Sequence, residues 1–101
     1  MRRDCRTDAN HQEISNAFER LGWSVLDIHQ IPNSADILVG KWKHSIVIEI
    51  KDGSKPPSKR KLTSGEIGFR DRWRGDYRIV ICLQDVIDLD KEYKNKAIAS
   101  K

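Results

Sequence analysis

The spacing of apolar residues changes several times along the chain, and each change predicts a different element. Four apolar residues recur at helical spacing near the start: Ile14, Ala17, Phe18 and Leu21. They predict an amphipathic helix that stops at Gly22 and has Asp8 or Asn10 as its N-cap.

The following apolar segments are typical of β-strands. Residues 23–31 form a β-like stretch that closes at the turn signal Pro32-Asn33-Ser34. Residues 36–39 predict a short strand that ends at Gly40. Residues 45–51 predict the clearest strand, because it is rich in β-branched side chains. With a tight turn at residues 41–44, these two strands are expected to form a hairpin.

The second half of the chain alternates loop, helix, strand and helix. Residues 52–61 are polar and contain two prolines, which indicates a loop, and residues 62–74 are expected to be helical. Residues 78–83 are expected to form a buried strand. From Gln84 onward a last helix is predicted, with a frayed, lysine-rich tail from about residue 91.

The predicted order is therefore α-β-β-β-α-β-α in a single domain over residues 1–101. The third strand, the following helix and the fourth strand form a crossover that should be right-handed and make the last two strands parallel. The expected fold is an α/β fold, in which helices flank a mixed β-sheet.

Composition and charge narrow the class of protein. The hydrophobic fraction is 38% and the charged fraction 34%, which indicates a thin core and a highly polar surface. A net charge of +4 makes a polyanionic partner plausible. No apolar segment approaches the roughly 20 residues of a membrane span, and the chain starts with polar sequence, so we expect a cytoplasmic protein without membrane contact. The three scattered histidines are expected to be surface or capping groups.

The candidate chemistry lies on the predicted hairpin. Strand side chains alternate between faces, so Glu49 and Lys51 should point the same way. Asp36 begins the partner strand, and antiparallel pairing can bring it beside Glu49. Two adjacent carboxylates repel each other, and a divalent cation such as Mg²⁺ would neutralise them. The carbonyl of Ile50 is a candidate third ligand, and Lys51 would lie beside a metal-bound water. The alternative is a solvated ion pair and a turn aspartate.

These residues resemble a known family. The runs Asp36-Ile-Leu-Val-Gly and Ile48-Glu-Ile-Lys-Asp-Gly-Ser-Lys-Pro-Pro-Ser-Lys-Arg-Lys-Leu-Thr are similar to small phage and prophage nucleases of the PD-(D/E)xK superfamily. More narrowly, they resemble its stand-alone VRR-NUC and Holliday-junction-resolvase-like group. The resemblance covers most of the chain, from the Arg-Arg-Asp start to Trp73-Arg74-Gly75, and Glu-Ile-Lys-Asp-Gly is its most specific part.

The resemblance implies a restriction-endonuclease-like fold and a Mg²⁺- or Mn²⁺-dependent phosphodiesterase that acts on structured DNA, often as a homodimer. The family's Asp, Glu and Lys correspond to Asp36, Glu49 and Lys51, and an acidic residue of its first helix corresponds best to Glu13. The chain departs from the family at Ala35, where a proline is usual. Proline contributes turn stiffness rather than a ligand, so the departure leaves the expected activity intact.

Two further acidic residues have two possible roles each. Glu13 flanks the apolar stripe of the first helix and is either a site residue or part of an Asn10-x-x-Glu13 capping box. Glu66 shares a helix face with apolar residues, and relatives have a Gln near this position. The run Thr63-Ser64-Gly65-Glu66 also spells a capping box, so both roles stay open.

A basic loop follows the catalytic strand and is the strongest candidate for binding DNA. Its cations, together with one arginine of the next helix, are expected to hold phosphates: Lys55, Lys59, Arg60, Lys61 and Arg70. A solvated charged loop is the alternative. The tryptophans are not interleaved with this run, so base stacking is not predicted. Trp73 is expected in the core and Trp42 exposed at the hairpin tip.

The residues thus predict a metal-dependent endonuclease that is structure-selective rather than sequence-specific, because no recognition helix with a readable base code is visible. A non-catalytic nucleic-acid-binding module that keeps the fold is the main alternative. A dimerising scaffold with incidental basicity is a third possibility, but it leaves the paired carboxylates unexplained.

Overall fold

The elements follow one another in the predicted order, α-β-β-β-α-β-α. The computed structural model describes residues 11–53 and 55–99. Seven helices and strands, with one short 3-10 helix (Pro57–Lys59) between β3 and α2, make up this part of the chain: α1 (His11–Arg20), β1 (Ser24–Asp27), β2 (Ile37–Lys41), β3 (His44–Ile50), α2 (Ser64–Arg72), β4 (Asp76–Val80) and α3 (Leu83–Ala99).

The four strands form one mixed sheet in the order β1-β2-β3-β4. β1 pairs with β2 and β2 with β3 in antiparallel fashion, whereas β3 and β4 are parallel. The predicted hairpin and the predicted parallel pair are therefore both confirmed. The hairpin turn consists of Trp42 and Lys43, which both have positive φ (53° and 66°), as a two-residue type I′ turn requires.

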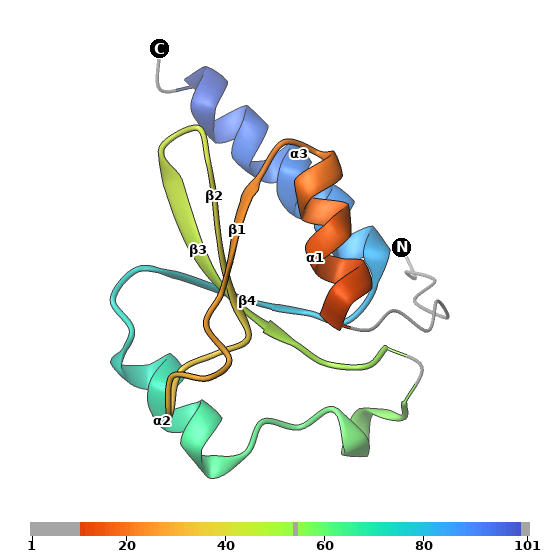
Figure 1. The fold of residues 1–101 in the computed structure, drawn as a ribbon, viewed down its shortest axis with the longest axis vertical. Helices are drawn as coiled ribbons and strands as arrows, with labels where there is room; N and C mark the ends of the chain where they lie inside the picture. The colour runs from red at the N-terminus through yellow and green to blue at the C-terminus, as the bar shows by residue number, and fades with distance from the viewer. Residues whose placement is uncertain (1–10, 54, 100–101) are drawn as a thin grey trace.

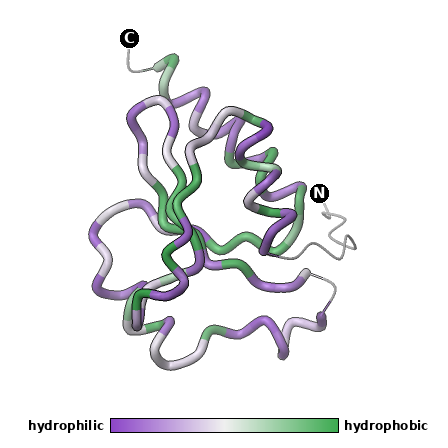
Figure 2. Tube along the Cα trace, in the orientation of Figure 1, coloured by the Kyte–Doolittle hydropathy of each residue, from purple (hydrophilic) through white to green (hydrophobic). Residues whose placement is uncertain are grey.

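α1 and α3 lie side by side over one face of the sheet, and α2 lies apart from them (Figure 1). The sheet side chains beneath α1 and α3 are fully buried: Ile37, Val39, Ile46, Ile48 and Val80. Hydrophobic residues accordingly follow the middle of the sheet, and hydrophilic residues follow much of the outer chain (Figure 2). Because side chains alternate along a strand, Val47, Glu49 and Lys51 belong to the opposite face.

Several predicted boundaries were wrong. β1 ends at Asp27 rather than near residue 31, α2 covers only Ser64–Arg72, and β4 begins at Asp76 and ends at Val80 instead of covering residues 78–83. No frayed tail begins near residue 91, because α3 continues to Ala99 and the buried Tyr93 anchors that part of it in the core. The predicted caps Asp8 and Asn10 lie outside the described residues.

The two tryptophan predictions were also wrong. Trp73 is 42% exposed; it stacks on Phe69, and its indole N–H donates to the carbonyl of Asp76 at 3.0 Å. Trp42 is partly buried and packs edge-to-face on Trp23, with ring centroids 5.9 Å apart. Among the described helices, none is both long and apolar enough to cross a membrane.

Candidate active site

Asp36 and Glu49 lie side by side where the β2–β3 hairpin opens. The register pairs Ile37 with Ile48, so the next pair outward is Asp36 and Glu49. The Asp36 backbone N–H donates to the Ile48 carbonyl at 3.1 Å, and its carboxylate Oδ2 accepts from the Ile50 N–H at 2.7 Å. The Asp36 carbonyl accepts from the Ile28 N–H at 3.1 Å. These three bonds fix Asp36 directly before β2.

Glu49 is the buried member of the group, with 5% of its surface exposed. Its pKa is raised to about 9, first by burial and then by hydrogen bonding and charge repulsion from Asp36 and Glu66. Without a cation nearby, the Glu49 carboxyl therefore keeps a proton at neutral pH. A divalent cation bound here would have to displace that proton.

Lys51 and Glu66 complete the group. The Lys51 ammonium donates to both carboxylate oxygens of Glu66, at 2.8 and 3.1 Å. Glu66 also forms the predicted capping box, since its Oε1 accepts from the Thr63 N–H at 2.7 Å while its own N–H donates to the Thr63 hydroxyl at 3.2 Å. Burial opposes ionisation of Glu66, but the bonds from Lys51 and Thr63 outweigh it and lower its pKa. Glu66 thus caps α2 and contacts Lys51 of the site at the same time.

The ligand chemistry at Asp36 fits a hard divalent cation. In a strand, the N–H and the carbonyl of one residue point to the same side. Since the Ile50 N–H points to Asp36 and the Lys51 N–H points to Val80 of β4, the Ile50 carbonyl faces the Asp36 side. Among the described residues, no group of three or more His, Cys, Asp or Glu side chains has the geometry of a metal site. Mg²⁺ needs only one or two carboxylates, with other oxygens and waters, so Asp36, Glu49 and the Ile50 carbonyl remain a suitable set.

A pocket of about 290 Å³ opens over these carboxylates. One wall is the β1–β2 loop, and the other is the start of α2; a Cβ on Gly65 would lie 3.4 Å from the Asn33 side-chain oxygen, so the two walls nearly touch. The residues that line it, mostly polar, are His29, Ile31, Pro32, Asn33, Ser34, Ala35, Asp36, Glu49, Thr63, Gly65 and Glu66.

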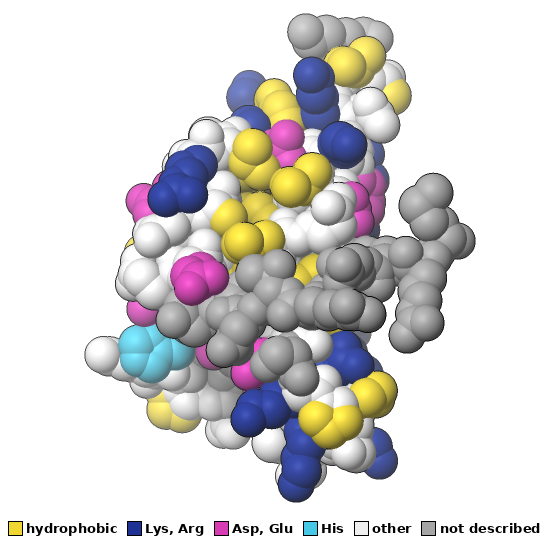
Figure 3. Space-filling model, turned by 90° about the vertical axis from the view of Figure 1, so that its right-hand side faces the viewer, with side chains coloured by type: hydrophobic (Ala, Val, Ile, Leu, Met, Phe, Trp, Pro, Cys, Tyr) yellow, Lys and Arg dark blue, Asp and Glu magenta, His cyan; other side chains and the backbone are white. Residues whose placement is uncertain are grey.

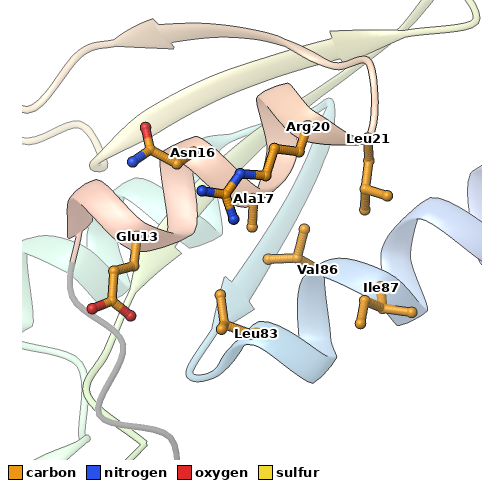
Figure 4. Close-up of a pocket in the computed structure, with 8 residues that line it drawn as sticks. All are labelled: Glu13, Asn16, Ala17, Arg20, Leu21, Leu83, Val86 and Ile87. Carbon is orange, nitrogen blue, oxygen red and sulfur yellow. The ribbon is translucent and has the colours of Figure 1, made fainter.

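Glu13 does not join this group. It lines a separate, more apolar pocket of about 460 Å³ between α1 and α3, with Arg20, Leu83 and Ile87 among its neighbours (Figure 4). That pocket belongs to the helical side of the sheet, where hydrophobic side chains gather (Figure 3). The capping alternative for Glu13 involves Asn10, which lies outside the described residues.

Two histidines that were expected to be isolated instead meet around one aspartate. The His29 ring Nδ1 makes a short hydrogen bond to the Asp27 carboxylate, and the His29 backbone N–H donates to the same oxygen at 3.1 Å. His11, at the start of α1, has its Nε2 3.7 Å from the other Asp27 oxygen, and the two imidazoles pack edge-to-face. The local spacing Asp27-x-His29 is the one sequence signal that could have indicated this cluster.

The basic loop has the exposure that phosphate binding needs. Lys55, Lys59 and Lys61 are exposed. Arg60 is half-buried, and its Nε has no hydrogen-bond partner within the described part of the chain. Lys and Arg side chains gather at the lower end of the face in Figure 3, where this loop runs in Figure 1. Arg70 is exposed on α2, and its Nε donates a hydrogen bond of 3.3 Å to the Asp71 carboxylate.

Comparison of the chain with known proteins identifies no relative: no family model, no curated protein and no solved structure matches it.

Proposed function

We propose that the chain is a divalent-metal-dependent endonuclease that hydrolyses phosphodiester bonds in DNA. The observation that carries the proposal is the linked group of Asp36, Glu49, Glu66 and Lys51 at the open end of one hairpin. It contains three carboxyl groups against one ammonium, and burial beside two acidic neighbours makes a negative charge on Glu49 costly unless a cation compensates it. The resemblance to PD-(D/E)xK nucleases assigns Asp36, Glu49 and Lys51 to the site.

Each residue has a distinct role in this proposal. Asp36, Glu49 and the Ile50 carbonyl hold Mg²⁺ or Mn²⁺. A divalent cation bound there would supply an activated water and neutralise charge on the phosphate. The Lys51 ammonium stabilises the charge that develops on the phosphate in the transition state. Glu66 positions Lys51 through the two hydrogen bonds of 2.8 and 3.1 Å.

The substrate is structured DNA, such as a junction or a branched duplex. The exposed cations of the loop after β3, with Arg60 and Arg70, are available for phosphates on either side of the scissile bond. These contacts carry no base information by themselves, which fits selection by shape rather than by sequence. We also propose a homodimer, because a two-fold dimer places two active sites on opposed strands.

The decisive experiment uses labelled junction, flap, duplex and single-stranded DNAs with Mg²⁺, Mn²⁺ or EDTA. We expect metal-dependent cleavage of branched DNA by the wild type, and none by Asp36→Asn or Glu49→Gln, with DNA binding kept. Glu92→Gln is a matched control, since its carboxylate pairs with Arg78 outside the pocket. Full activity in either site variant would remove the assignment.

The alternative function, a DNA-binding module without catalysis, predicts a different outcome in the same experiment. DNA would be bound but not cut with any metal. Neutralising Lys59, Arg60 and Lys61 tests the binding surface for both functions: affinity should fall across all sequences, and the salt dependence should flatten by about one unit of slope for each phosphate that is no longer bound. Light scattering tests the dimer, which the triple variant should leave intact.

A further inference from the structure

The pocket over the carboxylates has the β1–β2 loop as the wall opposite α2, and this wall carries an imidazole with a defined orientation. His29 lines the same pocket as Asp36, Glu49 and Glu66. Its side chain is 52% exposed, so a ligand in the pocket can reach it. Its orientation follows from Asp27, which binds both the ring Nδ1 and the backbone N–H of His29.

The loop that carries His29 is itself fixed by hydrogen bonds. The Ser34 hydroxyl interacts with the carbonyls of Ile28 and Ile31, at 3.0 and 2.7 Å, and the Ile31 N–H donates to the Ile28 carbonyl at 2.9 Å. His11 packs edge-to-face on the His29 ring, with centroids 5.9 Å apart. The imidazole is therefore held from its own loop, from β1 and from α1.

The two ring nitrogens of His29 differ in what they can do. Nδ1 is occupied by Asp27, whereas Nε2 has no hydrogen-bond partner among residues 11–53 and 55–99. A hydrogen bond at one ring nitrogen sets the state of the other, and an imidazole oriented by a carboxylate is a suitable group for proton transfer. The titratable groups around it are Asp27 and His11 on one side and the pocket residues Asp36, Glu49 and Glu66 on the other. The Asp27 carboxylate stays ionised, because hydrogen bonds from the ring and backbone of His29 lower its pKa.

We propose that His29, oriented by Asp27, is a catalytic residue of this pocket that contacts the phosphodiester through Nε2 and protonates the departing sugar oxygen. The inference rests on the proposed nuclease function and adds a residue to it. In the step, the oxygen of the attacking water forms a bond to phosphorus, and the bond from phosphorus to the sugar oxygen breaks. That oxygen takes the Nε2 proton, and the proton released by the water restores the imidazolium through solvent. Asp27 is a positioning residue, since it acts through His29.

Substrates with different leaving groups distinguish proton transfer by His29 from a purely structural role of this residue. A sugar hydroxyl needs a proton when it departs, whereas p-nitrophenolate does not. We therefore expect His29→Gln to lower kcat on branched DNA by about 100-fold, the lower end of what general acid catalysis contributes. The rate on bis(p-nitrophenyl) phosphate should change far less. Equal losses on both substrates would overturn the proton transfer, and a raised KM with unchanged kcat would reduce His29 to a binding residue.

Two controls make the result specific. His44→Gln changes the histidine at the start of β3, which packs on Tyr93 at 5.3 Å on the helical side of the sheet, and should leave both rates unchanged. Asp27→Asn should lower kcat on DNA, but the double variant with His29→Gln should be no slower than His29→Gln alone, because the two residues act as one unit. Additive losses would contradict the positioning role. Circular dichroism verifies that each variant is folded.

A measurement without turnover keeps this inference separate from the proposed function. Thymidine 3′,5′-bisphosphate is added to the wild type with Ca²⁺, and the imidazole resonances are followed by NMR. We expect the His29 ring signals to shift and those of His44 to stay unchanged. If no substrate is cleaved, the nuclease proposal and the proton-transfer step fall, while a shift at His29 still supports the phosphate contact. Unchanged His29 signals would overturn the contact as well.

Discussion

Two half-buried lysines, Lys41 at the end of β2 and Lys51 just after β3, make nearly the same ion pair in different surroundings. Lys41 is paired with Asp90 at 2.9 Å and Lys51 with Glu66 at 2.8 Å, and the exposures of the four side chains lie between 17% and 21%. Distance and burial therefore do not distinguish the two pairs. What distinguishes them is the balance of charge around each pair.

The Lys41 pair is balanced and enclosed by aromatic rings. Its ammonium lies 4.1 Å from the Trp42 ring centroid and also binds the Leu21 carbonyl, and Asp90 accepts from the Trp23 indole N–H at 3.0 Å. Every polar group there has a partner, which is what a structural ion pair needs. The Lys51 pair adjoins Asp36 and the buried Glu49, so one ammonium faces three carboxylates. Burial in these unbalanced surroundings raises the pKa of Glu49, and such shifted pKa values are common at functional sites.

The largest expected effect concerns the two ammonium groups. Lys51→Met keeps most of the aliphatic stem but removes the charge, so kcat on DNA should fall by at least about 100-fold, as for loss of one transition-state donor. Metal affinity should persist, since an ammonium is not a ligand. Lys41→Met makes the same chemical change in the balanced pair and should leave kcat unchanged. Single-turnover cleavage and calorimetric Mn²⁺ titration measure both effects, and a fully active Lys51→Met would contradict the distinction.

The second expected effect concerns stability against pH. The pKa of Glu49 rises from 4.5 to about 9 on folding. Between these values the folded protein keeps a proton that the unfolded chain has released, so metal-free stability should fall as pH rises, by at most about 1.4 kcal/mol per pH unit. From pH 5 to pH 8 the loss should be on the order of 4 kcal/mol. Urea unfolding in EDTA measures it. Glu49→Gln should have a flatter profile, and parallel profiles for the two proteins would refute the assignment.

A third effect compares the two acidic partners. Asp90→Asn removes the charge that Lys41 and Trp23 share, so stability should fall by about 1–2 kcal/mol without loss of turnover. Glu66→Gln keeps the capping box, in which Gln also serves, and should lower turnover with little change in Tm. Glu13→Gln should cleave normally, because Glu13 lines a different pocket. Thermal unfolding and cleavage rates on all three variants decide this, and slow cleavage by Glu13→Gln would return that residue to the site.

The sequence predicts those features of the two lysine sites that depend on residues close together in the chain. Alternation along β3 and antiparallel pairing with β2 place Glu49 beside Asp36, and both follow from residues within one hairpin. The capping box of Glu66 is equally local. The contact of Glu66 with Lys51 depends on where the loop after β3 places the start of α2, so the sequence left two roles open where the structure combines them.

Features that depend on packing between distant segments could not be predicted. Trp42 is part of the hairpin turn, a position that normally indicates exposure, but its ring packs on Trp23. Trp73 continues the apolar spacing of α2, yet that helix ends at Arg72 and has no buried residue. His11 meets Asp27 only because α1 packs beside β1. The lysines after residue 90 led to the prediction of a frayed tail, although Tyr93 continues the apolar face of α3 and is buried in the core.

The smallest expected effect tests whether the Lys41 end of the sheet is purely structural. Lys43 is exposed and has φ of 66°, a left-handed conformation that is costly for a side chain other than glycine. Lys43→Gly should relieve this strain, while the added freedom of the unfolded chain offsets part of the gain, so we expect a net stabilisation of about 0.5 kcal/mol. Trp42 is unsuitable for the same change, because its ring packs on Trp23 and beneath Lys41. Cleavage rates should be unchanged, since the turn is at the far end of the hairpin from Asp36 and Glu49. A Lys43→Gly variant with wild-type stability but altered turnover would mean that the two ends of the hairpin are coupled.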